Sequence, residues 1–121
     1  MTVAPFFWPV GEGEGPRFEP PPGVVVLGHD EMTHLVVRPG GDVVSIHPGG
    51  MRFVNSSEPL FGECLEALRA EWEVRRSLSD AEADAQARRL RAQLTAIDPP
   101  AVTGTDHWWA LVLEQLDDGL L

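Results

Sequence analysis

Several kinds of residue and segment are scarce in this sequence, and each scarcity excludes a class of protein. Cys64 is the only cysteine among 121 residues, which excludes an internal disulfide and a zinc site made of several cysteines. The apolar runs are only a few residues long, and the N-terminus has neither the basic start nor the cleavage site of a signal peptide. We therefore expect a cytoplasmic protein that does not bind membranes.

Basic residues are scarce as well. The chain has nine, all of them arginine, against 19 acidic residues, which gives a net charge of -10. Phosphate binding needs a basic surface, so direct binding of nucleic acid is not expected. Residues 98–121 carry five acids and no arginine. An acidic field of this kind speeds encounters with basic partners, although solubility alone would also explain it.

The length predicts a single domain over residues 1–121, and the composition divides it into three parts. Residues 1–23 are rich in glycine and proline and predict an irregular arm with at most a short edge strand, held by Phe6, Phe7 and Trp8. Residues 24–55 contain four β-prone runs, at 24–27, 34–38, 42–47 and 51–54. Pro-Gly-Gly at 39–41 and at 48–50 suits tight turns, which predicts an antiparallel meander.

Polar residues within these strands indicate how the sheet is placed. Arg38, Asp42, Ser45 and Arg52 stand among apolar neighbours. Such a mixture is typical of a sheet with one buried face and one partly solvated face. We therefore expect one face of the sheet to be buried and the other to be partly solvated.

The pattern becomes helical in residues 57–121. Apolar residues at spacings of three and four, from Phe61 to Trp72, predict a helix over about 58–76. The capping box from Ser79 to Glu82 starts a second helix, which Asp98-Pro99-Pro100 ends. A third is expected over about 106–118, with Gly119 as its C-cap. Strands followed by helices predict an α+β fold, in which a β-meander of about four strands packs against C-terminal helices.

The run Asn55-Ser56-Ser57 lies where the last strand meets the first helix. Asparagine and serine side chains accept hydrogen bonds from the amides of a first helical turn, so the run is interpreted as a helix cap. The alternative, that Ser56 or Ser57 is a nucleophile, requires a positioned base that the sequence does not indicate. Cys64 falls on the apolar stripe and is expected to be buried and inert.

Two further groups of residues leave alternatives open. His29-Asp30-Glu31 and His34 include metal-ligand types, but their spacing matches no known site, and a polar surface turn is the favoured interpretation. Trp108 and Trp109 point about 100° apart on a helix, which predicts that one packs and the other approaches the surface as a partner anchor. In the alternative, which is the favoured interpretation, both rings lie in the core or at its edge. No cofactor or metal ligand is predicted.

Four segments occur in order along residues 24–121. They are Val26-Leu27-Gly28 with the hairpin around Pro39-Gly40-Gly41, then Phe53-Val54-Asn55-Ser56-Ser57 followed by Phe61 and Leu65, then Ile97-Asp98-Pro99, and last Trp108-Trp109 through Leu113-Glu114 to Gly119. Together they resemble bacterial immunity proteins of the SUKH superfamily, specifically its fourth subgroup. The resemblance implies an α+β protein without enzymatic activity that neutralises a toxin of a polymorphic toxin system, often a nuclease or a nucleic-acid deaminase.

The resemblance and the charge together suggest how such a protein acts. A toxin that processes nucleic acid needs a basic active-site cleft, which an acidic inhibitor can block sterically and electrostatically. The candidate partner-binding residues are Glu12, Glu14 and Glu19 in the arm, Asp30 and Glu31 in the turn, and Asp106, Trp108, Trp109, Asp117 and Asp118 near the C-terminus. One alternative is a non-enzymatic adaptor or regulatory ligand-binding domain on the same scaffold, including a homodimer. Another is a small hydrolase with an unrecognised site.

Overall fold

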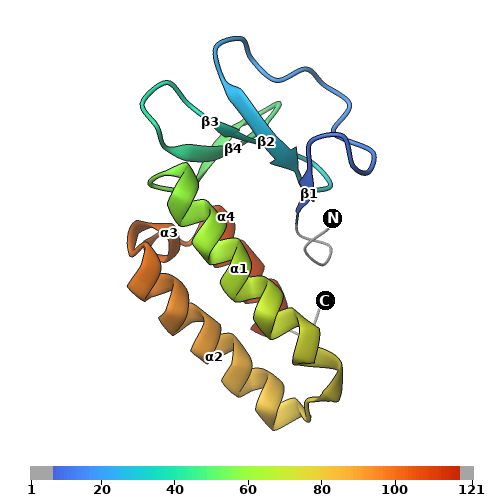
Figure 1. The fold of residues 1–121 in the computed structure, drawn as a ribbon, viewed down its shortest axis with the longest axis vertical. Coiled ribbons are helices and arrows are strands. Elements are labelled where there is room, and N and C mark those ends of the chain that lie inside the picture. The colour runs from blue at the N-terminus through green and yellow to red at the C-terminus, as the bar shows by residue number, and fades with distance from the viewer. Residues whose placement is uncertain (1–6, 118–121) are drawn as a thin grey trace.

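The computed structural model describes residues 7–117, with only the backbone at residue 76, and has an α+β fold (Figure 1). Five antiparallel strands form one sheet in chain order: β1 (Trp8–Pro9), β2 (Val25–His29), β3 (His34–Val37), β4 (Val43–His47) and β5 (Gly50–Asn55). The helices are α1 (Glu58–Val74), the 3-10 turn η1 (Arg75–Ser77), α2 (Asp80–Ile97), α3 (Pro100–Thr103) and α4 (Trp108–Asp117). In Figure 1 the strands gather at one end of the molecule, and α1 and α2 run side by side away from them.

The predicted meander and helices are confirmed, with two additions. β1 is the short edge strand allowed for the arm, and it pairs with β2. The proline pair after Asp98 ends α2 as expected, but Pro100 also opens α3, because proline is tolerated in a first helical turn whose amides need no partner. Ser79 and Glu82 form the predicted capping box. The expected C-cap, Gly119, lies outside the described residues. Among the helices of residues 7–117, none is both long and apolar enough to cross a membrane.

The core lies between the sheet and the helices. Leu35, Val43 and Val54 of the sheet cluster with side chains of all four α-helices, and the predicted stripe of α1 supplies Phe61, Cys64 and Leu68. Ser45 pairs with Leu35 on one side and with Arg52 on the other, so all three project from the same, helix-facing side of the sheet. Ser45 is fully buried on this face.

Both tryptophans of α4 belong to the core. Trp108 is 5% exposed and Trp109 is 0% exposed, and their rings meet edge to face with centroids 4.9 Å apart. The rings point in different directions, as expected, but α4 lies against β5, α2 and α3, so both directions are covered. The expectation that one ring approaches the surface is wrong, and the alternative of two core tryptophans is confirmed.

The N-terminal arm is fastened to the sheet edge by aromatic contacts. Phe7 is buried and meets Phe61 of α1 edge to face, with ring centroids 5.3 Å apart. Trp8 stacks on His29 at 5.7 Å. Phe6, the third aromatic of the arm, lies outside the described residues. The arm passes so close to β2 that a Cβ atom at Gly28 would meet the carbonyl oxygen of Trp8 and would lie 2.5 Å from Cζ of Phe7.

This close approach predicts that Gly28→Ala destabilises the protein. The added methyl group must displace the backbone of β1 or the ring of Phe7, an overpacking that costs about 1–3 kcal/mol. The control is Gly62→Ala in α1, where an added Cβ meets nothing within 4 Å and helix propensity gains about 1 kcal/mol. Chemical denaturation should give opposite signs for the two variants. Equal effects would contradict the tight contact between arm and sheet.

Candidate functional site

The end of β5, the end of α2 and the start of α4 meet at a buried polar cluster, which we call the Asn55 network. Asp98, 2% exposed, accepts hydrogen bonds at Oδ2 from Nδ2 of Asn55 (2.9 Å) and the backbone amide of Ser56 (2.8 Å). Its Oδ1 accepts from Oγ of Ser56 at 2.8 Å. Oδ1 of Asn55 accepts from the indole of Trp109 at 2.8 Å, and its Nδ2 also lies 3.4 Å from Sγ of Cys64.

This network changes the interpretation of Asn55-Ser56-Ser57. Only Ser57 caps α1, accepting from the amide of Leu60 at 3.3 Å. The prediction that Asn55 and Ser56 cap this helix is wrong, because Asn55 lies at a buried position of β5 and both side chains bond to Asp98 instead. Serine and asparagine side chains can donate hydrogen bonds to a distant carboxylate as readily as they accept hydrogen bonds from the amides of a helix end. Asn55, Asp98 and Trp109 come from three of the four segments that suggested the family, and these three segments thus meet in the Asn55 network.

The network predicts a large difference between two neighbouring substitutions. Asn55→Ala removes one donor from the Asp98 carboxylate and leaves the buried indole of Trp109 without its acceptor, which should cost about 2–4 kcal/mol of unfolding free energy. Ser57→Ala removes only a helix cap and should cost about 1 kcal/mol. Urea denaturation measures both. A loss at Ser57 as large as that at Asn55 would contradict the assignment of roles.

Cys64 lies beside the network and is wholly buried, as the sequence predicted. Burial in apolar surroundings raises the pKa of its thiol to about 11, since the thiolate would lose its hydration. The hydrogen bond from Asn55 lowers the pKa, but by less than burial raises it.

We expect Cys64 to resist thiol reagents in the native protein. At pH 8 only about one thiol in a thousand is ionised at a pKa of about 11, and the sulfur is also inaccessible. Reaction with a maleimide should be slow in buffer and fast in denaturant. Between pH 7 and pH 9 the reaction rate of the folded chain should rise only in proportion to the small thiolate fraction. Rapid stoichiometric labelling of the folded chain would show that the thiol is exposed.

The turn between β2 and β3 is built around Asp30. Its Oδ1 accepts from the amides of Met32 (2.8 Å) and Thr33 (2.6 Å), the geometry by which aspartate closes a turn on its own backbone. Its Oδ2 accepts from the indole of Trp108 at 2.9 Å. The predicted polar turn is therefore confirmed, and Trp108 fixes that turn to α4.

Two histidines hold the arm beside this turn. Nε2 of His29 lies 2.7 Å from the carbonyl oxygen of Glu12, and its Nδ1 lies 3.0 Å from that of Asp30. Nε2 of His34 lies 2.7 Å from the carbonyl oxygen of Phe18. Within residues 7–117 no three or more His, Cys, Asp or Glu side chains are placed to hold a metal ion together.

A hollow of about 350 Å³ opens between this turn, the sheet and α4, and we call it the turn hollow. Its lining consists of Asp30, Glu31, Met32, Thr33, Ser45, Arg52, Trp108, Leu111, Val112 and Gln115. Three buried side-chain atoms have no hydrogen-bond partner among the described residues: Oγ1 of Thr33, Oγ of Ser45 and Nε of Arg52. All three residues line the turn hollow.

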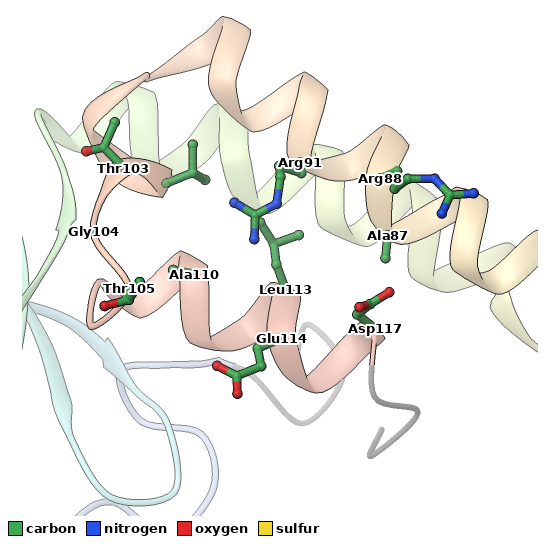
Figure 2. Close-up of a pocket in the computed structure, with 11 residues that line it drawn as sticks. Ala87, Arg88, Arg91, Thr103, Gly104, Thr105, Ala110, Leu113, Glu114 and Asp117 are labelled. Atoms are coloured by element: carbon green, nitrogen blue, oxygen red, sulfur yellow. The ribbon is translucent and has the colours of Figure 1, made fainter.

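A second, larger hollow of about 440 Å³ lies between α2 and α4 and is called the helix groove (Figure 2). Its charged lining residues are Arg88 and Arg91 on α2 and Glu114 and Asp117 on α4. Figure 2 shows Arg91 reaching into the space between the two helices. These four side chains are exposed, and none of the buried unpartnered atoms found in the described residues lies here. The turn hollow is therefore the better candidate for a binding site.

The candidate partner residues fall into several places. Asp30, Glu31 and Trp108 line the turn hollow. Glu12, Glu14 and Glu19 lie on the arm, Asp106 lies between α3 and α4, and Asp117 borders the helix groove. Trp109 is enclosed in the core, and Asp118 lies outside the described residues. Sequence reasoning did not select Thr33, Ser45 or Arg52. The signal of Ser45 and Arg52 was polarity within β-prone runs, which does not tell the inner face of a strand from the outer one. Thr33 precedes the run that begins at His34 and gave no such signal.

Comparison with known protein families gives a match over most of the chain. The model of the SUKH-4 immunity protein family matches residues 11–115, which includes the arm from Gly11 onward, the turn hollow and the whole Asn55 network. The match thus begins before the 24–121 segment in which the sequence motifs were found. No curated protein and no solved structure matches the chain.

Proposed function

The chain belongs to the SUKH-4 immunity protein family, and from this premise we propose that it neutralises a protein toxin by covering the toxin's basic active-site cleft. The toxin is proposed to be a nuclease or a nucleic-acid deaminase of a polymorphic toxin system. Such an enzyme must hold phosphates with positive charge, so a negatively charged inhibitor competes for the same field. Inhibition by coverage requires complementary shape and charge and needs no catalytic step by this chain.

The observation that carries the proposal is the contrast between neutralised and uncompensated carboxylates. Ion pairs engage Asp42, Glu66, Glu71 and Glu73. Arginine side chains hydrogen-bonded to Asp42 and Glu71 lower the pKa of those carboxyls. Of the candidate contacts, Glu14, Glu19, Asp30, Glu31, Asp106 and Asp117 form no ion pair within the described residues. Their charge is therefore available to a partner.

Within this set we propose the arm and the β2–β3 turn as the contact face. His29 contacts the carbonyl oxygens of both Glu12 and Asp30, so these two segments lie side by side. Asp117 is nine residues beyond Trp108 on α4, about 14 Å along the helix axis, and belongs to a different part of the surface. The buried Trp108 contributes by holding Asp30 in place, since its ring is not available as an anchor.

The test is co-expression with the toxin encoded beside the chain, together with measurement of association rates. Glu14→Gln with Glu31→Gln removes two charges from the proposed face and should lower the association rate roughly tenfold at low salt, with a weaker dependence on ionic strength. The control pair, Glu63→Gln with Asp84→Asn, removes two charges from exposed positions on α1 and α2 and should change the rate much less.

Three results would contradict this proposal. The first is an association rate that does not change with ionic strength. The second is an equal effect of the two pairs of substitutions on the association rate. Either result would contradict electrostatic steering by this face. The third is a tight complex without protection of the host cell. That result would favour the non-enzymatic adaptor over the inhibitor.

A further inference from the structure

The turn hollow differs from an ordinary surface depression because buried polar side chains without hydrogen-bond partners among the described residues line it. Thr33 is 7% exposed and Ser45 is 0% exposed, yet neither hydroxyl has a partner among the described residues, and the same is true of Nε of Arg52. A buried polar group without a hydrogen bond costs about 1–3 kcal/mol. Three such atoms around one hollow of about 350 Å³ indicate a place built for a polar group from outside.

The three atoms gather because of the strand register. Ser45 and Arg52 are direct cross-strand partners in β4 and β5, and their side chains therefore project from the same face. Thr33 directly precedes β3, whose Leu35 pairs with Ser45, and it lines the same hollow. Leu111 and Val112 of α4 close the hollow with apolar surface.

The chemistry of these atoms selects the group that fits. Nε of Arg52 only donates, so the occupant must offer an acceptor, whereas the two hydroxyls can donate or accept. Asp30 and Glu31 line the same hollow and bring two acidic side chains to it. A carboxylate would bond to Arg52 but meet these two acids, and an ammonium group would meet Arg52. A neutral carboxamide supplies a carbonyl oxygen for Arg52 and an NH₂ group for the hydroxyls or carboxylates.

We propose that the turn hollow binds one carboxamide group, presented by a glutamine or asparagine side chain of the toxin. The identity of the partner rests on the proposed function, but the chemistry of the hollow does not. The aliphatic part of the side chain packs on Leu111, Val112 and Met32, and the carboxamide reaches the buried atoms below. The acidic face attracts the toxin, and the hollow sets the register in which it docks.

The experiment is an NMR titration of the full chain, because the Nε–H of Arg52 gives its own signal. Three probes are compared: Nα-acetylglutamine methylamide, Nα-acetylglutamate methylamide and Nα-acetyllysine methylamide. The glutamine probe should shift the Arg52 Nε–H signal saturably, and more than the other two probes shift it. No saturable shift with the glutamine probe, or a larger one with either charged probe, would overturn the proposal.

A pair of serine substitutions provides the control. Ser45→Ala removes a hydroxyl without a hydrogen-bond partner in residues 7–117, so it should leave stability unchanged or raise it while weakening binding of the glutamine probe about fivefold. Ser77→Ala removes an exposed hydroxyl that bonds to the carbonyl of Val74 and should leave binding unchanged. Thr33→Val serves as a second variant and should weaken binding like Ser45→Ala. Unchanged affinity in both hollow variants would overturn the assignment.

The titration and the co-expression test fail in different ways. If the glutamine probe binds at Arg52 but the chain gives no protection from the toxin encoded beside it, the carboxamide site is supported and the toxin-inhibiting function is contradicted. If the chain protects the host cell but the glutamine probe does not bind, the toxin-inhibiting function is supported and the carboxamide site is contradicted.

Discussion

The fold depends on one buried carboxylate that forms no ion pair within the described residues. Asp98 is enclosed where α2 ends, and three donors from Asn55 and Ser56 replace the water that it loses on folding. The indole of Trp109 completes the arrangement through Asn55. Each bond joins elements that are more than 40 residues apart in sequence, so the network fixes the sheet, α2 and α4 in one mutual position.

The placement of α4 then determines what the surface can do. Because Trp109 is fixed to Asn55, the preceding residue, Trp108, faces the β2–β3 turn and donates to Asp30. That bond fixes the turn beside α4, and the turn hollow lies between them, lined in part by Ser45 and Arg52. The position of the proposed recognition site thus depends on the Asn55 network. Trp109 connects α4 to that network, and Trp108 connects α4 to the β2–β3 turn.

The same chain of contacts explains which predictions from sequence succeeded. Strands divided by Pro-Gly-Gly turns and the helix start at Ser79 depend on local chemistry, and both were predicted correctly. Asn55 and Ser56 were misassigned because a helix cap and a distant carboxylate require the same side-chain atoms. The face on which Ser45 lies was not predicted, because alternation defines two faces and does not say which one the helices will cover. The buried unpartnered atoms could be found only once three strands and a helix were in place.

Family membership and partner choice therefore rest on different residues of this chain. Asn55, Asp98 and Trp109, which lie in the segments that reveal the family, are enclosed and cannot touch a partner. They specify the scaffold. Discrimination between toxins must come from side chains that a partner can reach, and at the turn hollow these are Glu31 and Met32 on the rim and the polar atoms beneath them. Because Asp30 fixes the turn backbone through its own hydrogen bonds, the two rim positions can carry other side chains while the Asn55 network stays unchanged. A scaffold of this kind can change its target by altering the two rim positions of the turn, Glu31 and Met32, while Asp30 keeps its bonds to the turn backbone and to Trp108.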